Sequence, residues 1–435
     1  MMKLLLDECR VKLYKEERSN RDIINEIVTA KQKEGDDDRF VVCDLGDVIS
    51  KVQRWRKLMP RVKIFYAVKC NSSEPLLKVL ADMGVSFDCA SKNEIEAVLK
   101  LGISPTRIVY AHPYKPVSSL LHAKYKDVSL MTFDCSEELF KVKEFYPSAR
   151  LLLRLLPEVE FQAEVQFNGK FGCPLSDVEN VLRVAKQLNL NIVGVSFHVG
   201  SGVQDPKAYV PILHQSKKVF DIANSLGFVL NVLDIGGGFP GHQGSLKRFE
   251  AMSTVINKTL EEMFPPSIEI IAEPGRYIVA SAFTVVAYIF GKRCHSNVTC
   301  MYGKDSNREN SMSSNHETST TYFLNDSIFG SFVDCCLCRP GSEEYTPNIL
   351  RHKSEDKLVE STISGFAPFD VLNKSVMLPD LNVGDWIYYE NMGAYTMSMA
   401  TSFNGISVPD IMYHCLENLW HDVYSDQRLY CTKRP

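Results

Sequence analysis

The sequence predicts an α/β protein in which a TIM-like (β/α)8 barrel is followed by a second, β-rich domain of the sandwich or barrel type. Between residues 62 and 275, short β-branched or aromatic runs alternate with segments of helical apolar spacing. After about residue 281 helical periods become scarce, and strand-like runs such as "AFTVVAYIFGKR" and "DWIYYENM" follow. An open doubly wound sheet is the alternative for the first domain.

The expected barrel strands are short runs that end in turn residues. They cover residues 62–68, 85–90, 107–113, 128–134, 150–156, 191–199, 230–237 and 268–275. The segments between them repeat apolar residues at three- and four-residue spacing, and several end in glycine, a common helix C-cap. Such alternation favours right-handed connections and a parallel sheet. We therefore assign residues 46–280 to the barrel, and residues 1–45 with 281–435 to the β-rich domain.

Composition and charge exclude several classes of protein. The chain has 435 residues. Its formal net charge of −4 and pI near 6.2 show no excess of positive charge for binding nucleic acid or an anionic membrane. The longest apolar stretch, "YIVASAFTVVAYIFG", is too short to span a bilayer. Thirteen cysteines and no expected secretion signal indicate a reducing, cytoplasmic location. The polar segment 294–320 is expected to form a mobile surface loop.

Polar residues stand at the ends of the expected strands. Because the carboxyl ends of barrel strands converge on one face, these side chains should meet there. One such residue alone would only mark a strand exit into water, whereas the whole set favours a site. The set comprises Lys69, Asp88, His112, Asp134, Arg154, His198, Gly236–Gly238, Glu273 and Arg276.

The chemistry of this set is specific. Lys69 ends the apolar run "FYAVKCN", and a lysine in an apolar pocket can lose its proton and form a Schiff base with an aldehyde. The stretch "GGGFPG" offers backbone N–H groups to a phosphate, and Arg276 adds a charge. Glu273 can hold a proton on a pyridine nitrogen, and His198 can stack on a ring. Pyridoxal 5'-phosphate needs these groups, whereas a nicotinamide enzyme would not need Lys69.

Longer motifs resemble those of the eukaryotic ornithine decarboxylases. They are "FYAVKCN", "FDCASKNEIE", "FHVGSG", "LDIGGGFPG", "AEPGRY", "GDW" and "ENMGAYT", in order over residues 38–410. The resemblance implies an alanine-racemase-like barrel with a β-domain, pyridoxal phosphate, an amino-acid substrate, and a head-to-tail homodimer with shared sites. By motif match, the cofactor-binding residues are Lys69, Asp88, Arg154, His198, Ser201, Gly236, Gly237, Gly238, Glu273, Gly275, Arg276 and Tyr395, and Lys69, His198 and Glu273 are also catalytic.

The chain departs from this family on the substrate side. Leu337 and Cys338 stand where the family has a Tyr-Asp pair whose Asp grips the substrate's distal ammonium, and Asp334 lies four positions early. In "SGFAPFDVLN", an ungapped match puts Pro368 and Phe369 at a catalytic Cys-Asp pair. A one-residue gap, which we prefer, puts Phe369 and Asp370 there instead.

Either alignment removes the family's cysteine. We expect Cys338, Phe369 and Asp370 to meet the substrate, with Asp370 catalytic as well, and ornithine to be a poorer substrate than an amino acid with an uncharged side chain. In the gapped match Asn373 replaces an acidic residue that, in the family, pairs between subunits with the lysine matching Lys170.

Two further features of the sequence bear on partners. Cys335, Cys336 and Cys338 lie close together, but no second pair follows at zinc spacing, so we expect no metal site. Residues 115–145 overlap the region where ornithine decarboxylases meet antizyme. We expect a solvated barrel helix there, and antizyme remains a candidate partner. The alternative to an enzyme is a catalytically weak or inactive regulator that resembles the antizyme inhibitors.

Overall fold

The structure is a computed structural model that describes residues 11–159, 162–165, 169–295, 319–339, 345–351 and 357–424. Most of the polar segment 294–320, expected to be a mobile loop, lies outside the described residues. So does the side chain of Leu337. No helix among the described residues is long and apolar enough to cross a membrane.

Eight parallel strands close into a barrel in the order β11-β12-β3-β4-β5-β6-β7-β9. The prediction of a (β/α)8 barrel with a separate β-rich region is therefore confirmed, and the open doubly wound alternative is excluded. The strands are β3 (Val62–Ala67), β4 (Ser86–Cys89), β5 (Ile108–Tyr110), β6 (Leu130–Phe133), β7 (Arg150–Leu155), β9 (Asn191–Phe197), β11 (Val232–Asp234) and β12 (Glu269–Ala272).

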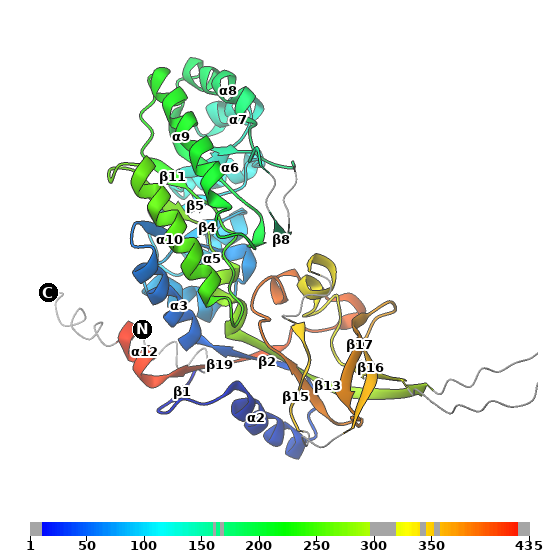
Figure 1. Cartoon of the computed structure of the whole chain (residues 1–435). Helices are drawn as coiled ribbons and strands as arrows, with labels where there is room; N and C mark the ends of the chain where they lie inside the picture. Colours follow the sequence, from blue (N-terminus) through cyan, green and yellow to red (C-terminus); the bar gives the residue numbers. More distant parts are fainter. Residues whose placement is uncertain are drawn as a thin grey trace, which may run out of the picture.

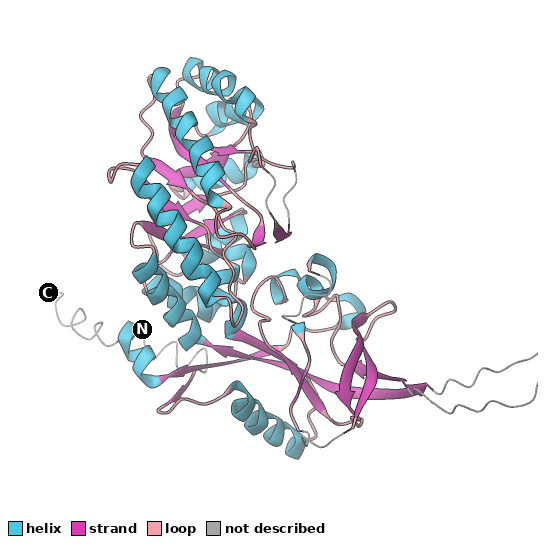
Figure 2. Cartoon of the chain, in the orientation of Figure 1, coloured by secondary structure: helices cyan, strands magenta, loops and turns pink. Residues whose placement is uncertain are grey.

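Helices surround the barrel, as Figure 2 shows. They begin where the sequence supplies caps: the side chain of Ser91, for example, accepts from the backbone N–H of Glu94 at the start of α5. The helices on the barrel are α3 (Leu45–Leu58), α4 (Glu74–Asp82), α5 (Lys92–Leu99), α6 (Val117–Tyr125), α7 (Ser136–Phe145), α8 (Leu175–Gln187), α9 (Tyr209–Ser225), α10 (Leu246–Met263) and α11 (Arg276–Val279).

The barrel interior is a packed core rather than a pore. Side chains from seven of the eight strands, all but β4, form one buried cluster: Phe65, Val109, Leu130, Leu152, Val193, Val232 and Ile271. Sites of this fold are built beyond the carboxyl ends of the strands.

The second region is a mixed sheet in which chain segments far apart in sequence pair directly. β2 (Phe40–Asp44) pairs antiparallel with β13 (Phe283–His295) and parallel with β19 (Asp410–Leu416). The remaining strands of this sheet are β1 (Lys12–Tyr14), β14 (Ser319–Leu324), β15 (Asn348–Ile349), β16 (Leu358–Ser364), β17 (Val371–Pro379) and β18 (Trp386–Tyr389). A short pair, β8 (Ala163–Val165) and β10 (Ser201–Val203), stands apart at the barrel.

The N-terminal helix α2 (Asn20–Glu34) covers part of this sheet (Figure 1). Its apolar residues Ile23, Ile24 and Val28 share a buried cluster with Phe40 and Trp386. The C-terminal helix α12 (Glu417–Tyr424) packs instead against α3 and β19. The N-terminal segment is thus joined to the β-rich region through both a strand and a helix.

Candidate active site

A cavity of about 510 Å³ opens at the carboxyl ends of the barrel strands. This volume lies within the range of small-molecule and cofactor sites. Ten of the residues expected to bind cofactor line it: Lys69, Arg154, His198, Ser201, Gly237, Gly238, Glu273, Gly275, Arg276 and Tyr395. Of the two others, Asp88 contacts Lys69, and Gly236 holds the backbone of Glu273 by accepting its N–H at 2.8 Å.

Lys69 lines the cavity, two residues after the end of β3. Its ammonium pairs with the buried carboxylate of Asp88, while its side chain stays 40% exposed toward the cavity. Burial alone would lower the pKa of Lys69, but Asp88, then Tyr395 and Glu273, outweigh that effect and raise it. The expectation of a lysine that readily loses its proton in an apolar pocket is therefore wrong for this chain by itself: the pocket holds a charged ion pair.

Glu273, which lines the cavity, and Asp234 form a pair of buried acids. Burial, then Asp234 and Asp88, raise the pKa of Glu273, and burial raises that of Asp234 to about 7. No hydrogen-bond donor among the described residues reaches Glu273 Oε1 or Asp234 Oδ2. Burial disfavours the charged form of a carboxyl group. Glu273 is therefore a buried group that can hold a proton at the cavity.

The glycine-rich turn is shaped for close approach. Gly238 has a positive φ of 111°, and a Cβ there would lie 2.9 Å from the carbonyl oxygen of Gly200. Gly236 (φ 65°) would bring a Cβ within 2.2 Å of the Phe197 carbonyl oxygen. Only glycine fits these positions, because neighbouring backbone lies so close. Gly237 and Gly238 of this turn line the cavity.

His198 stands beside this turn as a neutral ring. Burial, then Arg154 and Lys69, lower its pKa well below the ordinary value. Its Nδ1 accepts the backbone N–H of Gly200 at 3.0 Å, which fixes the ring orientation. A neutral, oriented imidazole is suited to stacking on a flat ligand.

Arg276 is held by an acidic partner that we did not assign to it from the sequence. Its two terminal nitrogens donate to Asp334 at 2.8 and 3.1 Å, and its Nε donates to Ser201 at 3.2 Å. Burial would lower the pKa of Arg276, but Asp334 outweighs burial and raises it. Asp334 is therefore committed to an arginine and is not free for a substrate ammonium.

The predicted substrate residues do not line this cavity in the single chain. Asp370 is buried and accepts the backbone N–H groups of Ile328 at 2.8 Å and Ala367 at 3.0 Å. Phe369, beside it, is 96% exposed and has a positive φ of 68°. Cys338 is half-buried, and burial, then Asp334, raise the pKa of its thiol.

Other residues at strand ends divide between the cavity and the scaffold. His112 and Lys170 line the cavity, whereas Asp134 is buried and accepts the Gly172 N–H at 2.9 Å. Asn373 bonds within its own chain, to Tyr345 and Tyr389.

Sequence reasoning missed Phe171, which lines the cavity and whose ring lies 5.4 Å from both His112 and the Arg154 guanidinium. Its place just after Lys170 in "GKFG", between glycines, was the available signal.

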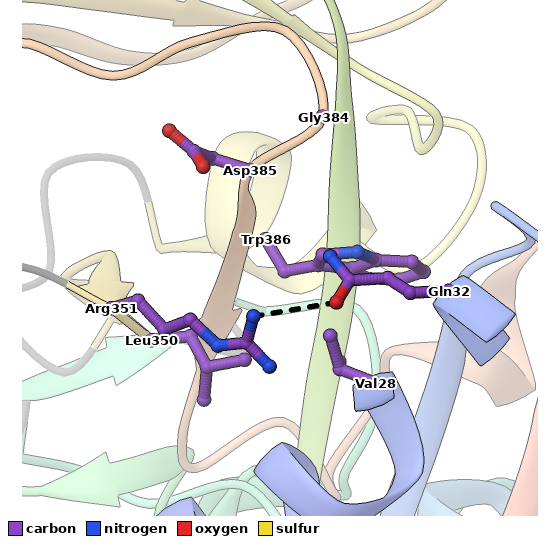
Figure 3. A pocket seen from close by; sticks show the side chains of 7 residues that line it. All are labelled: Val28, Gln32, Leu350, Arg351, Gly384, Asp385 and Trp386. Atoms are coloured by element: carbon purple, nitrogen blue, oxygen red, sulfur yellow. Dashed lines mark hydrogen bonds between the residues drawn. The ribbon is translucent and has the colours of Figure 1, made fainter. Parts of the chain in front are cut away.

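A second, smaller cavity lies between α2 and the β-rich sheet (Figure 3). Its volume of about 30 Å³ suits water rather than a cofactor. Arg351 reaches across it to Gln32 at 3.3 Å. Within the described parts of the chain, no group of three or more His, Cys, Asp or Glu residues could hold a metal ion.

Comparison with known proteins gives this arrangement its context. Residues 45–280 match the pyridoxal-binding domain of the pyridoxal-dependent decarboxylases. The chain is 41% identical over 407 residues to rat (Rattus norvegicus) ornithine decarboxylase, covering 92% of this chain and 86% of that protein. It is equally 41% identical over 414 residues to Xenopus laevis antizyme inhibitor 2, covering 94% and 88%.

Among solved structures, the arginine decarboxylase of Paramecium bursaria Chlorella virus superposes with a TM-score of 0.80 at 35% identity. The match covers 90% of this chain and 100% of that one. The barrel, its cavity and these matches over most of the chain lead to one conclusion: the protein belongs to the family of pyridoxal-dependent ornithine and arginine decarboxylases.

Proposed function

We propose that this chain uses its pyridoxal phosphate to decarboxylate an amino acid with an uncharged side chain. The family supplies the reaction and the cofactor. The proposed substrate class rests on the observation that both acids in the altered motifs already have partners within the chain. Asp334 pairs with Arg276, and Asp370 accepts two backbone N–H groups. A distal ammonium placed beside them would lack a free carboxylate, and an unpaired buried charge is costly.

The residues present fit the cofactor. The cavity lining contains groups that suit a phosphate: the Gly237–Gly238 backbone, Ser201, Gly275, Arg276 and Tyr395. N–H, hydroxyl and guanidinium groups all donate to phosphate oxygens. Glu273 Oε1 has no hydrogen-bond donor among the described residues, as expected of an acceptor for a protonated pyridine nitrogen. His198 would stack on the ring, and Lys69 would bind the aldehyde carbon.

When bound, pyridoxal phosphate supplies an electron sink for the bond that breaks between the substrate's α-carbon and its carboxylate. Glu273 would hold the proton at the pyridine nitrogen and thereby keep that sink electron-poor. Arg276 and the glycine turn would hold the phosphate. Ala67, Ala90, Ala111 and Phe171 line the cavity with apolar surface, which favours loss of a charged carboxylate.

The family's cysteine, which guides the returning proton, is absent from this chain. Phe369 has no proton to give, and Asp370 is bound to backbone. Lys69 Nζ lines the cavity and is kept charged by Asp88. We therefore assign to Lys69 the proton that replaces the carboxylate at the α-carbon.

The test is a comparison of kcat/KM for leucine, phenylalanine, lysine and ornithine, following CO2 together with amine and aldehyde products. One charge-assisted hydrogen bond is worth about 1.5–3 kcal/mol, so we expect the uncharged substrates to be favoured by about tenfold or more. Efficient ornithine turnover that is lost in Asp370→Ala, in a variant that remains folded, would refute the proposed substrate class.

A second candidate function is binding of antizyme, which one surface favours. Along α6, Val117, Leu121 and Tyr125 are 37%, 46% and 82% exposed at four-residue spacing, and Phe140 of α7 is 55% exposed. The three α6 side chains share one face of their helix, and such exposed apolar surface is unusual for a solvated helix. Affinity measurements with purified antizyme and Tyr125→Ala would test it: binding that Tyr125→Ala does not weaken would exclude this helix face as the contact.

We further propose that the active form is a homodimer in the cytoplasm. The proposal of a dimer rests on the loop at Phe369, where a large apolar side chain is almost fully exposed. The cytoplasmic location rests on the thirteen cysteines, of which those in the described parts of the chain form no disulfide.

A further inference from the structure

Arg276 enters the cavity with most of its donors already used. Its side chain is 4% exposed, and a guanidinium has five N–H donors. Two of its nitrogens donate to the two oxygens of Asp334, and Nε donates to Ser201. The residue best suited to bind a phosphate dianion therefore already binds a carboxylate.

Asp334 is itself firmly held. It is 1% exposed, and Tyr345 donates its hydroxyl to Asp334 Oδ2 at 2.6 Å. Arg339, also buried, donates to the same Tyr345 hydroxyl at 2.9 Å and pairs with Glu164 at 2.5 Å. Among the described residues, the network contains two cations, Arg276 and Arg339, and two anions, Asp334 and Glu164. Arg276 and Asp334 balance each other's charge within it before any phosphate arrives.

We propose that Asp334 competes with the cofactor's phosphate for Arg276 and so sets how tightly this chain holds pyridoxal phosphate. This inference rests on the proposed placement of the phosphate beside Arg276. A phosphate that enters this network meets a guanidinium whose charge is already balanced, and it approaches a buried carboxylate of its own sign. Replacing Asp334 by an isosteric neutral residue would leave one positive charge for the phosphate to balance.

The test uses Asp334→Asn in the full chain, stripped of cofactor and titrated separately with pyridoxal phosphate, pyridoxal and inorganic phosphate. Gaining one charge-assisted interaction should tighten binding of pyridoxal phosphate and inorganic phosphate by about tenfold to a hundredfold. The affinity for pyridoxal, which lacks the phosphate, should stay unchanged. Affinity of the variant for pyridoxal phosphate that is equal to or weaker than wild type would overturn the competition.

Cofactor-free Asp334→Asn contains two arginines facing one anion and could fail to fold. In that case the variant is purified with its cofactor, and the rate at which it loses pyridoxal phosphate to an excess of scavenger is compared with wild type. The proposal requires loss that is at least tenfold slower; an equal or faster rate refutes it.

Two control variants distinguish a failure of this inference from a failure of the proposed phosphate position beside Arg276. Asp326→Asn removes another buried acid paired with an arginine, Arg39 at 3.1 Å, in the β-rich region. It should lower stability and leave both phosphate affinities unchanged; an increase like that of Asp334→Asn would refute a local effect. Arg276→Gln should weaken binding of pyridoxal phosphate. If it does not, the placement of the phosphate is wrong, whereas failure of Asp334→Asn alone overturns only the competition.

Discussion

At the scale of single residues, Asp234 and Glu273 place two acids in one buried position. Asp234 also accepts the backbone N–H of Gly236 at 2.9 Å, so it shapes the glycine turn as well as lying beside Glu273. The charged groups facing this pair are Asp88, Lys69 and Arg154. The pKa values of both acids are raised, which shows that burial outweighs the effect of the two cations.

The pair gives stability a pH dependence. An acid whose folded pKa lies above its unfolded value binds more protons when folded, so stability falls as pH rises between those values. For Asp234 the window runs from about 4 to about 7. As pH rises across this window, the free energy of unfolding of the cofactor-free wild type should therefore fall by on the order of 2–4 kcal/mol relative to that of Asp234→Asn.

Urea unfolding of both proteins at several pH values measures this difference. The amide of Asn keeps a donor for Glu273 without a titrating proton, so its curve should be flatter. Parallel curves for the two proteins would show that Asp234 does not carry the proton.

At the scale of elements, the loop from Gly365 to Asp370 is a compact turn closed by one carboxylate. Asp370 binds the N–H groups of Ile328 and Ala367, and its carbonyl accepts the N–H of Gly365 at 2.7 Å. The neighbouring π-helix, Asp334–Cys338, is similarly fixed at its start by Arg276. Both elements that carry the altered motifs are thus held by acids, and these acids act as structural anchors within the chain.

Asp370→Ala should therefore destabilise the chain as well as alter activity. Two partly buried backbone N–H groups would lose their acceptor, at a cost of about 1–3 kcal/mol in the free energy of unfolding. Asp370→Asn keeps one acceptor oxygen and should cost less. Urea midpoints at an unchanged m-value measure both variants. A fully stable Asp370→Ala with lost turnover would instead assign Asp370 to the reaction itself.

At the scale of the whole molecule, the cavity is built by both regions of the chain. Tyr395, which follows β18, donates its backbone N–H to the carbonyl of Cys70 at 3.0 Å, next to Lys69. This contact holds a tyrosine of the β-rich region over the barrel mouth. Phe369 projects from the same region in a backbone conformation that is strained for a phenylalanine, which favours a partner that covers it.

Replacing Phe369 with Asp should weaken dimerisation by at least tenfold, because a charge would be buried in an apolar contact. Asp tolerates a positive φ at least as well as Phe, so the fold itself should survive. Sedimentation velocity over a range of concentrations measures the effect. Val229→Asp, at a highly exposed valine (83%) on the barrel, is the matched control and should leave dimerisation unchanged. Equal dimer affinity in Phe369→Asp would place the interface elsewhere.

The sequence by itself determined the barrel and most of the cavity. Local periodicity predicted the eight barrel strands, and Lys69, His198 and Glu273 follow strands whose ends must converge. Only the tertiary structure decided the partners of the acids. Asp334 lies 58 positions from Arg276, and Asp370 lies 42 from Ile328. No local pattern couples such distant side chains: their pairing depends on how the β-rich region packs on the barrel. The pairing of Lys69 with Asp88 is also tertiary. The sequence alone therefore suggested a lysine that loses its proton easily, whereas in the fold Asp88 contacts Lys69 and raises its pKa.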